Sequence, residues 1–258
     1  MKCWICGQIA DSSEHKIKKS TLKKVYGDEF RYSQMLHIKD GNSTFIQGPD
    51  SKKIQYLKTI CKDCNGTRTQ EYDRSYDTFF DYVQKESLKI IEKRIIDFYD
   101  VYGEEFVINQ LNLFKYLVKN FGCDLVYTGL EVPLDLKGLL QKEKFLTKLV
   151  ISFAINEDKL LLQNPNEAGM GIGELTGWYP YKGHPIPEGY IWEIYFSFLH
   201  ICFWYNRPIN GPMGAPWIAN NRYIYLGSFY PLSQEQRKVF KEKIANNSIH
   251  ADPESLRL

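Results

Sequence analysis

The chain has no long uninterrupted apolar run and no recognisable secretory signal. Its most apolar stretch, Tyr190–Tyr205, is interrupted by Glu193 and His200 and is too short to span a membrane. The N-terminus lacks a basic segment followed by an apolar run and a small-residue cleavage site. We therefore expect a cytoplasmic protein without a membrane partner. In such a reducing compartment, Cys-x-x-Cys pairs are more often metal ligands or redox motifs than disulfides.

Excess charge of either sign is also small, and the sequence has no internal repeat or low-complexity tract. A length of 258 residues with 43% hydrophobic and 25% charged residues indicates a globular protein with one large domain or two small ones. The formal net charge of +2 excludes nothing by itself. Residues 1–74, however, hold 14 Lys or Arg against 9 Asp or Glu, a local excess of +5 that is compatible with a phosphate-bearing partner.

Large apolar residues are scarce in residues 1–65, and a segment with so little core normally needs a metal ion to fold. From Tyr72 onwards, apolar residues recur at steps of three and four and predict one long helix that ends near Gly103. These residues are Tyr72, Tyr76, Phe79, Phe80, Val83, Ile90, Ile91, Ile95 and Phe98. A second helix should follow, with Val107, Leu111, Phe114 and Val118 on one face and Gly122 as its stop.

The sequence after Pro133 favours strands. Residues 145–164 predict two strands around a turn at 156–158, and residues 190–206 and 222–230 predict further strands. Residues 233–247 predict a last helix, because Ser233 and Gln236 have the spacing of a capping box. We therefore expect an α+β protein. Residues 1–102 would form a zinc module with its following long helix, and residues 103–258 an α+β domain with antiparallel strands.

Four of the six cysteines form two Cys-x-x-Cys pairs, Cys3 with Cys6 and Cys61 with Cys64. Each pair lets two thiolates converge on one ion, and two pairs complete the tetrahedral sulfur shell of a structural zinc ion. The 54 residues between the pairs must contain a hairpin or an insertion. A redox role would want a single pair beside a βαβ pattern, and neither pair has one.

Zinc accounts for the cysteines but not for three polar residues beside them. Glu14 and His15 form a dipeptide soon after the first pair, and Asn65 directly follows the second. If one zinc ion joins the two segments, these three residues come close together. Carboxylate and amide oxygens suit a hydrated divalent ion, and a neutral imidazole could take a proton from water. The combination predicts hydrolysis of a phosphodiester.

The order Cys-x-x-Cys, Glu-His, Cys-x-x-Cys-Asn closely resembles the zinc-stapled branch of the HNH (His-Me finger) endonucleases, which includes phage endonuclease VII. The resemblance covers roughly residues 1–85, and "CNGTRTQEYDRSYDTFFDYV" also resembles the helix entry of HNH-type proteins from bacteria and phages. It implies a treble-clef-like ββα-metal module in which the four cysteines hold structural zinc. It also implies that His15 activates water while Glu14 and Asn65 bind a catalytic Mg²⁺ or Mn²⁺ ion.

Two positions depart from the pattern of this family. Many members place a last metal-binding histidine on the helix, where this chain has none; Gln70 and Asp73 are the nearest substitutes. The Asp73 carboxylate suits a hard cation better than the Gln70 amide. Many members also have a proline three residues after the catalytic histidine, where this chain has Lys18.

Simpler interpretations of the same residues stay open. His15 could be a surface histidine, and Asn65 could be a turn or helix N-cap residue. The nearby lysines could grip phosphates or form the solvated side of a helix; they are Lys16, Lys18, Lys19, Lys23 and Lys24. Aspartates at every fourth position are typical of a polar helix face; they are Asp73, Asp77 and Asp81.

The leading hypothesis is a metal-dependent endonuclease that hydrolyses DNA, in restriction, anti-phage defence or a mobile element. The C-terminal half would bind DNA, a partner protein or a small effector and so direct the nuclease. The alternative is a catalytically inactive zinc-knuckle module that binds nucleic acid or protein. A redox protein is the third hypothesis.

Overall fold

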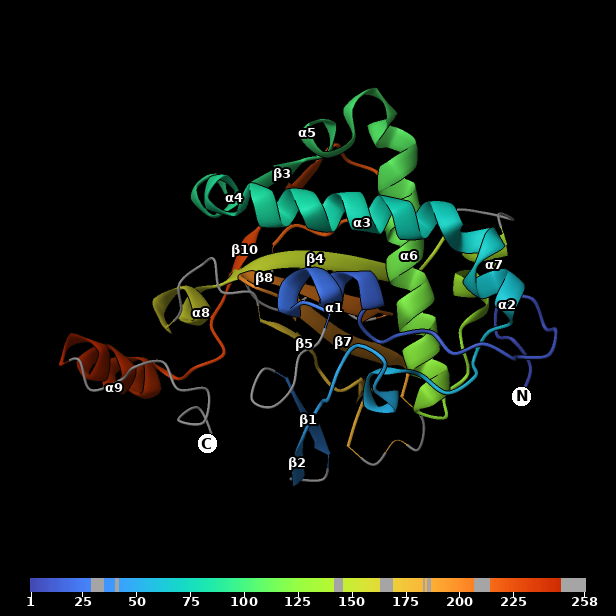
Figure 1. Ribbon diagram of the computed structural model, residues 1–258, viewed down its shortest axis with the longest axis horizontal. Coiled ribbons are helices and arrows are strands. Elements are labelled where there is room, and N and C mark those ends of the chain that lie inside the picture. Colours follow the sequence, from blue (N-terminus) through green and yellow to red (C-terminus); the bar gives the residue numbers. More distant parts are fainter. Residues whose placement is uncertain are drawn as a thin grey trace.

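The computed structural model describes residues 1–28, 35–39, 42–141, 146–162, 169–182, 184, 187–206 and 214–246. Within them the fold is a mixture of helices and sheets, as expected (Figure 1). The helices are α1 (Lys19–Tyr26), α2 (Lys62–Asn65), α3 (Gln70–Lys85), α4 (Ser87–Lys93), α5 (Phe98–Tyr102), α6 (Phe106–Tyr127), α7 (Leu134–Gln141), α8 (Glu157–Leu162) and α9 (Gln234–Ala245). Three short 3-10 helices are η1 (Lys52–Ile54), η2 (Thr67–Thr69) and η3 (Gly103–Glu105). None of the described helices has the length and apolar character needed to cross a membrane.

The largest sheet has six strands in the order β10-β4-β8-β7-β5, with β6 also paired to β7. Its strands are β4 (Leu149–Asn156), β5 (Met170–Ile172), β6 (Thr176–Trp178), β7 (Gly189–Phe196), β8 (Leu199–Tyr205) and β10 (Gly227–Phe229). All neighbours are antiparallel except β10 and β4, which run parallel. Two small antiparallel ribbons complete the fold, β1 (Leu36–Lys39) with β2 (Asn42–Phe45) and β3 (Ile95–Asp97) with β9 (Tyr223–Tyr225). The antiparallel arrangement predicted for the C-terminal half is therefore correct except at β10.

One face of the large sheet packs against α3 and α6, which cross each other (Figure 1). The Phe79 ring of α3 lies 6.2 Å from the Phe153 ring of β4, and the Phe121 ring of α6 lies 5.7 Å from the Phe203 ring of β8. The same buried cluster includes Cys3 near the N-terminus. The core therefore runs across residue 102 without a break. The proposed division of function at that residue stays a prediction.

The single helix predicted between Tyr72 and Gly103 is wrong. Helix α3 starts where expected, but the segment continues as α4, β3 and α5. Arg94 ends α4 in a left-handed conformation with φ of 57°, and the following strand β3 pairs with β9. The apolar periodicity continued because each of these short elements buries one side, so it did not reveal the breaks.

Two further expectations need correction. Gly122 does not stop the second helix but lies inside α6, where an added Cβ would be only 2.4 Å from Cζ2 of Trp4. The residues after Asn156 form helix α8 rather than a second strand. The last helix is confirmed together with its capping box, since Ser233 and Gln236 exchange side-chain-to-backbone hydrogen bonds.

Candidate functional site

The two Cys-x-x-Cys pairs converge, as the sequence predicted. Four Sγ atoms all lie within 4.8 Å of one another, those of Cys3, Cys6, Cys61 and Cys64. The Sγ atoms of Cys6 and Cys61 are 3.6 Å apart, close to the edge of about 3.8 Å expected for a tetrahedron with Zn–S bonds of about 2.3 Å. None of the four forms a disulfide. Four free thiols in this arrangement fit a tetrahedral metal ion.

Local backbone geometry prepares each pair for this role. After the first pair the chain turns at Gly7, whose φ of 77° is in the left-handed region, and the Gly7 amide donates to the Cys3 carbonyl at 2.8 Å. The second pair begins α2, where the Cys61 sulfur accepts a hydrogen bond from the Cys64 amide. One pair thus lies on a tight turn and the other on the first turn of a helix.

Two extended segments, 12–16 and 54–60, run antiparallel beside the cysteine cluster. The amide of Tyr56 donates to the carbonyl of Glu14 at 2.8 Å, and His15 forms an isolated bridge with Gln55. Helices α2 and α3 follow directly, while α1 and the β1–β2 ribbon lie in the interval between the two segments. The predicted insertion between the cysteine pairs is therefore a helix and a hairpin.

Glu14 points into the protein, away from its neighbour His15, because successive side chains in an extended segment face opposite sides. Glu14 is 7% exposed as a whole residue, and its Oε2 lies 3.4 Å from Nζ of Lys119 in α6. The same Nζ lies 3.2 Å from Oδ1 of Asp73 in α3 and donates to Oγ1 of Thr69 at 3.4 Å. Glu14 and Asp73 therefore converge, but a lysine ammonium lies between them.

The charges in this cluster are strongly coupled. Burial alone would lower the pKa of Lys119, but Glu14 and Asp73 outweigh burial and raise it, so the ammonium form is favoured. Burial raises the pKa of Glu14 more than the attraction of Lys119 lowers it. A fully buried lysine needs such partners to stay charged.

His15 is half-buried on the other side of the segment. Its Nε2 lies 3.3 Å from Nε2 of Gln55. An amide nitrogen only donates, so the His15 Nε2 is the accepting nitrogen. Burial lowers the pKa of His15, and contacts with the Pro49 backbone and Asp50 only partly oppose this. The imidazole is therefore neutral at pH 7 and has the form that a general base requires.

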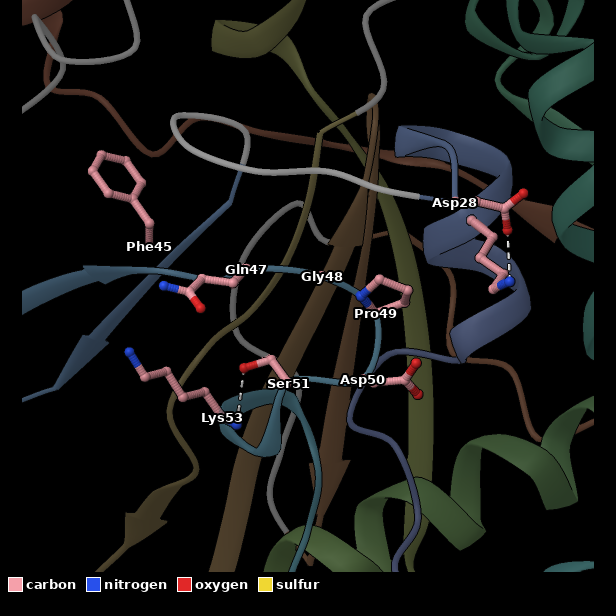
Figure 2. A pocket seen from close by; sticks show the side chains of 9 residues that line it. Asp28, Phe45, Gln47, Gly48, Pro49, Asp50, Ser51 and Lys53 are labelled. Atoms are coloured by element: carbon pink, nitrogen blue, oxygen red, sulfur yellow. Dashed lines mark hydrogen bonds and ion pairs between the residues drawn. The ribbon is translucent and has the colours of Figure 1, made fainter.

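A polar hollow of about 440 Å³ lies between α1 and the turn before η1 (Figure 2). Pro49 and Asp50 line the hollow and also interact with His15. Two lysines, Lys23 and Lys53, reach the same hollow, where Lys23 pairs with Asp28. The turn before η1 thus links His15 to the hollow.

Asn65 lies against the Glu14 segment through its side-chain amide. Its Nδ2 donates to Oγ of Ser12 at 2.8 Å and to the carbonyl of Ser13 at 3.2 Å. Among the described interactions, none joins its side chain to that of Glu14 or His15. Gln70, the other candidate ligand, is exposed at the start of α3. The fold therefore brings the Asn65 side chain beside the backbone next to Glu14, and Gln70 takes no part in the described cluster.

The lysines of residues 16–24 have partners within the protein. Lys18 binds Asp77 at 2.7 Å and Lys24 binds Asp81 at 2.6 Å, so the aspartate face of α3 is tied to α1. Lys19 pairs with Asp50, and Lys16 lies 4.0 Å from the centre of the Tyr127 ring. These contacts favour a structural role for most of this lysine group.

Lys119 is the residue that sequence reasoning missed. The segment that forms α6 contains only three charged residues, Lys115, Lys119 and Asp124, in an otherwise apolar and neutral stretch. The sequence did offer one signal for a buried charge. Lys119 directly follows Val118, a residue of the predicted apolar face of this helix. A buried lysine needs a carboxylate partner, and the sequence could not say which one.

The donor set around Lys119 suits a hard cation, but the described arrangement does not fit a divalent one. The carboxylates of Glu14 and Asp73 are both within 3.4 Å of a buried positive charge. A second cation at this position would meet repulsion from that ammonium. The expected catalytic Mg²⁺ or Mn²⁺ ion therefore stays a prediction.

No protein-family model, no curated protein and no solved structure matches the chain.

Proposed function

We propose that this protein is an HNH-type endonuclease that hydrolyses phosphodiester bonds of DNA. The observation that carries the proposal is the position of Asn65, whose amide binds Ser12 and the Ser13 carbonyl directly before the Glu14–His15 dipeptide. The four-thiol cluster, as a structural zinc site, would hold these two segments together. The antiparallel segments 12–16 and 54–60, followed by α3, support a ββα-metal module of the treble-clef type.

His15 is the proposed general base. Its neutral imidazole would take a proton from water at Nε2 as the water oxygen attacks phosphorus and the bond to the leaving oxygen breaks. The Gln55 amide that now faces Nε2 would give way to that water. Pro49 would orient the ring through its backbone contact, and the hollow that Pro49 and Asp50 line would receive a phosphate.

A second candidate is a catalytically inactive zinc-knuckle module that binds nucleic acid or protein. Lys119 favours this alternative, because its ammonium already neutralises the two carboxylates that would otherwise hold a catalytic ion. The C-terminal domain would then direct binding rather than cleavage. Both candidates share the zinc module and differ in chemistry alone.

Incubation of supercoiled plasmid with the purified protein separates the two. We expect nicked or linear DNA with Mg²⁺ or Mn²⁺ and none with EDTA. For His15→Ala we expect the cleavage rate to fall by at least about 10²-fold. His37→Ala, a histidine of β1 outside the dipeptide, serves as the matched control and should cleave normally. A folded, zinc-loaded protein that retards DNA in a mobility-shift assay without cutting it under any of these conditions would replace the nuclease with the binding module.

A further inference from the structure

The cluster around Lys119 differs from an ordinary surface ion pair in how completely it is enclosed. The Lys119 side chain is 0% exposed and that of Glu14 is 9% exposed. The Nζ atom of Lys119 lies 3.2 to 3.4 Å from oxygen atoms of three residues, Glu14, Asp73 and Thr69. These groups come from the first extended segment, α3 and η2. The ammonium therefore has several oxygen ligands, as a bound cation would.

The position of this ammonium matters because it coincides with the proposed metal position. Glu14 and Asp73 are the two carboxylates expected to hold a hard divalent ion, and both bind Nζ of Lys119 instead. The backbone carbonyl of Asp73 is also engaged, since Lys18 donates to it at 2.9 Å. Lys18 is a second nearby cation, with its Nζ 4.0 Å from Oδ1 of Asp73 and 20% of its side chain exposed, whereas the Lys119 side chain is fully buried.

We propose that Lys119 is an internal counter-cation that competes with the divalent ion for the Glu14–Asp73 position. The inference rests on the proposed function in one respect, that this position is the catalytic-metal position of an HNH-type module. The native chain then binds Mg²⁺ or Mn²⁺ weakly. Removing the ammonium while keeping the length of the side chain leaves two carboxylates and a hydroxyl facing one small space, which is a ligand set for a hard divalent ion.

The test measures Mn²⁺ binding rather than cleavage. Free Mn²⁺ is followed by electron paramagnetic resonance during titration of the zinc-loaded native chain, Lys119→Met and Lys119→Arg. The thiol cluster does not take part, because soft thiolates retain zinc against Mn²⁺. We expect Lys119→Met to bind one Mn²⁺ at least about tenfold more tightly than the native chain, since a like charge next to the ion is gone. Lys119→Arg keeps the charge and should bind as weakly as the native chain.

The double variant Lys119→Met/Glu14→Gln locates the gained site and should lose it. If Lys119→Met does not fold, Lys119→Gln, which is neutral but keeps a polar end group, takes its place, with folding checked by zinc content and circular dichroism. A folded variant with no gain in Mn²⁺ affinity would overturn the proposal. So would a native chain that already binds Mn²⁺ as tightly as the variant through Glu14.

Cleavage is recorded separately, so that the two proposals fail separately. A variant that gains the Mn²⁺ site but cuts no DNA supports the role of Lys119 and counts against the nuclease. A native chain that cuts DNA, together with a Lys119→Met variant that gains no metal, supports the nuclease and removes the role of Lys119.

Discussion

The ammonium of Lys119 lies 3.4 Å from the Glu14 carboxylate, and both groups are buried although they come from distant parts of the sequence. This pair joins the extended segment next to the cysteine cluster to the central helix α6. The Glu14 side of that segment is the side that faces the protein interior. His15, the next residue, lies on the opposite side of the segment, towards Gln55.

The buried pair should make Lys119 and Glu14 strongly coupled in stability. Lys119→Met is expected to lower the free energy of unfolding by about 3 kcal/mol, because the Glu14 charge is left buried without its partner. Adding Glu14→Gln should restore part of the loss, since no buried charge at that position then remains. A double-mutant cycle by urea denaturation at saturating zinc measures the coupling. Losses that simply add would show that the two groups do not interact as described.

The cysteine cluster should hold one zinc ion per chain. Cys3→Ser is expected to remove the metal and unfold the N-terminal third, because a structural zinc ion supplies folding free energy to the segments that it joins. The measurements are metal analysis of protein purified without chelator and circular dichroism. Cys202→Ala, a buried cysteine of β8 outside the cluster, is the control and should keep its zinc. Native protein with much less than one zinc per chain would contradict the assignment.

Gly122 should tolerate no side chain. An added Cβ would lie 2.4 Å from Cζ2 of Trp4, which lies between Cys3 and Cys6 in the sequence. Gly122→Ala must therefore displace the Trp4 ring, which we expect to cost about 1–3 kcal/mol of stability and to weaken zinc binding. Thermal unfolding and zinc competition by a chelator measure both effects. Gly173→Ala, whose new Cβ would only touch Glu193 at 3.4 Å, is the matched control and should change neither.

Asp124 of α6 should make stability depend on pH. Burial raises its pKa to about 6, although Lys16 opposes the rise. The unfolded chain has a pKa near 3.9, so between about pH 4 and pH 6 the folded protein binds a proton that the unfolded chain does not. Stability should therefore fall as pH rises through this range, by about 3 kcal/mol in total.

Asp124→Asn isolates this effect, because the amide has nearly the same shape and does not titrate. Urea denaturation of both proteins between about pH 4 and pH 7 should show the stability of the native protein falling relative to that of the variant as the pH rises, with most of the fall below about pH 6. Parallel curves would mean that Asp124 ionises normally in the folded protein.

The local patterns of the sequence determined several features in advance. The convergence of the two cysteine pairs was predictable because Cys-x-x-Cys spacing sets the geometry of each pair within four residues. The capping box at Ser233 and the strands within 190–206 were predictable for the same reason, since turn, cap and alternation signals act over short distances. The start of α3 after Asn65 belongs to this group.

Only the tertiary structure decided which groups meet across the fold. Apolar periodicity shows that an element has a buried side, but it does not show what the opposing element presents there. It therefore missed the break at Arg94 and the Trp4 ring against Gly122. Above all, it could not place Lys119 beside Glu14. That contact follows from the packing of α6 against α3 and the cysteine module, and a buried charge takes whichever partner the packing supplies.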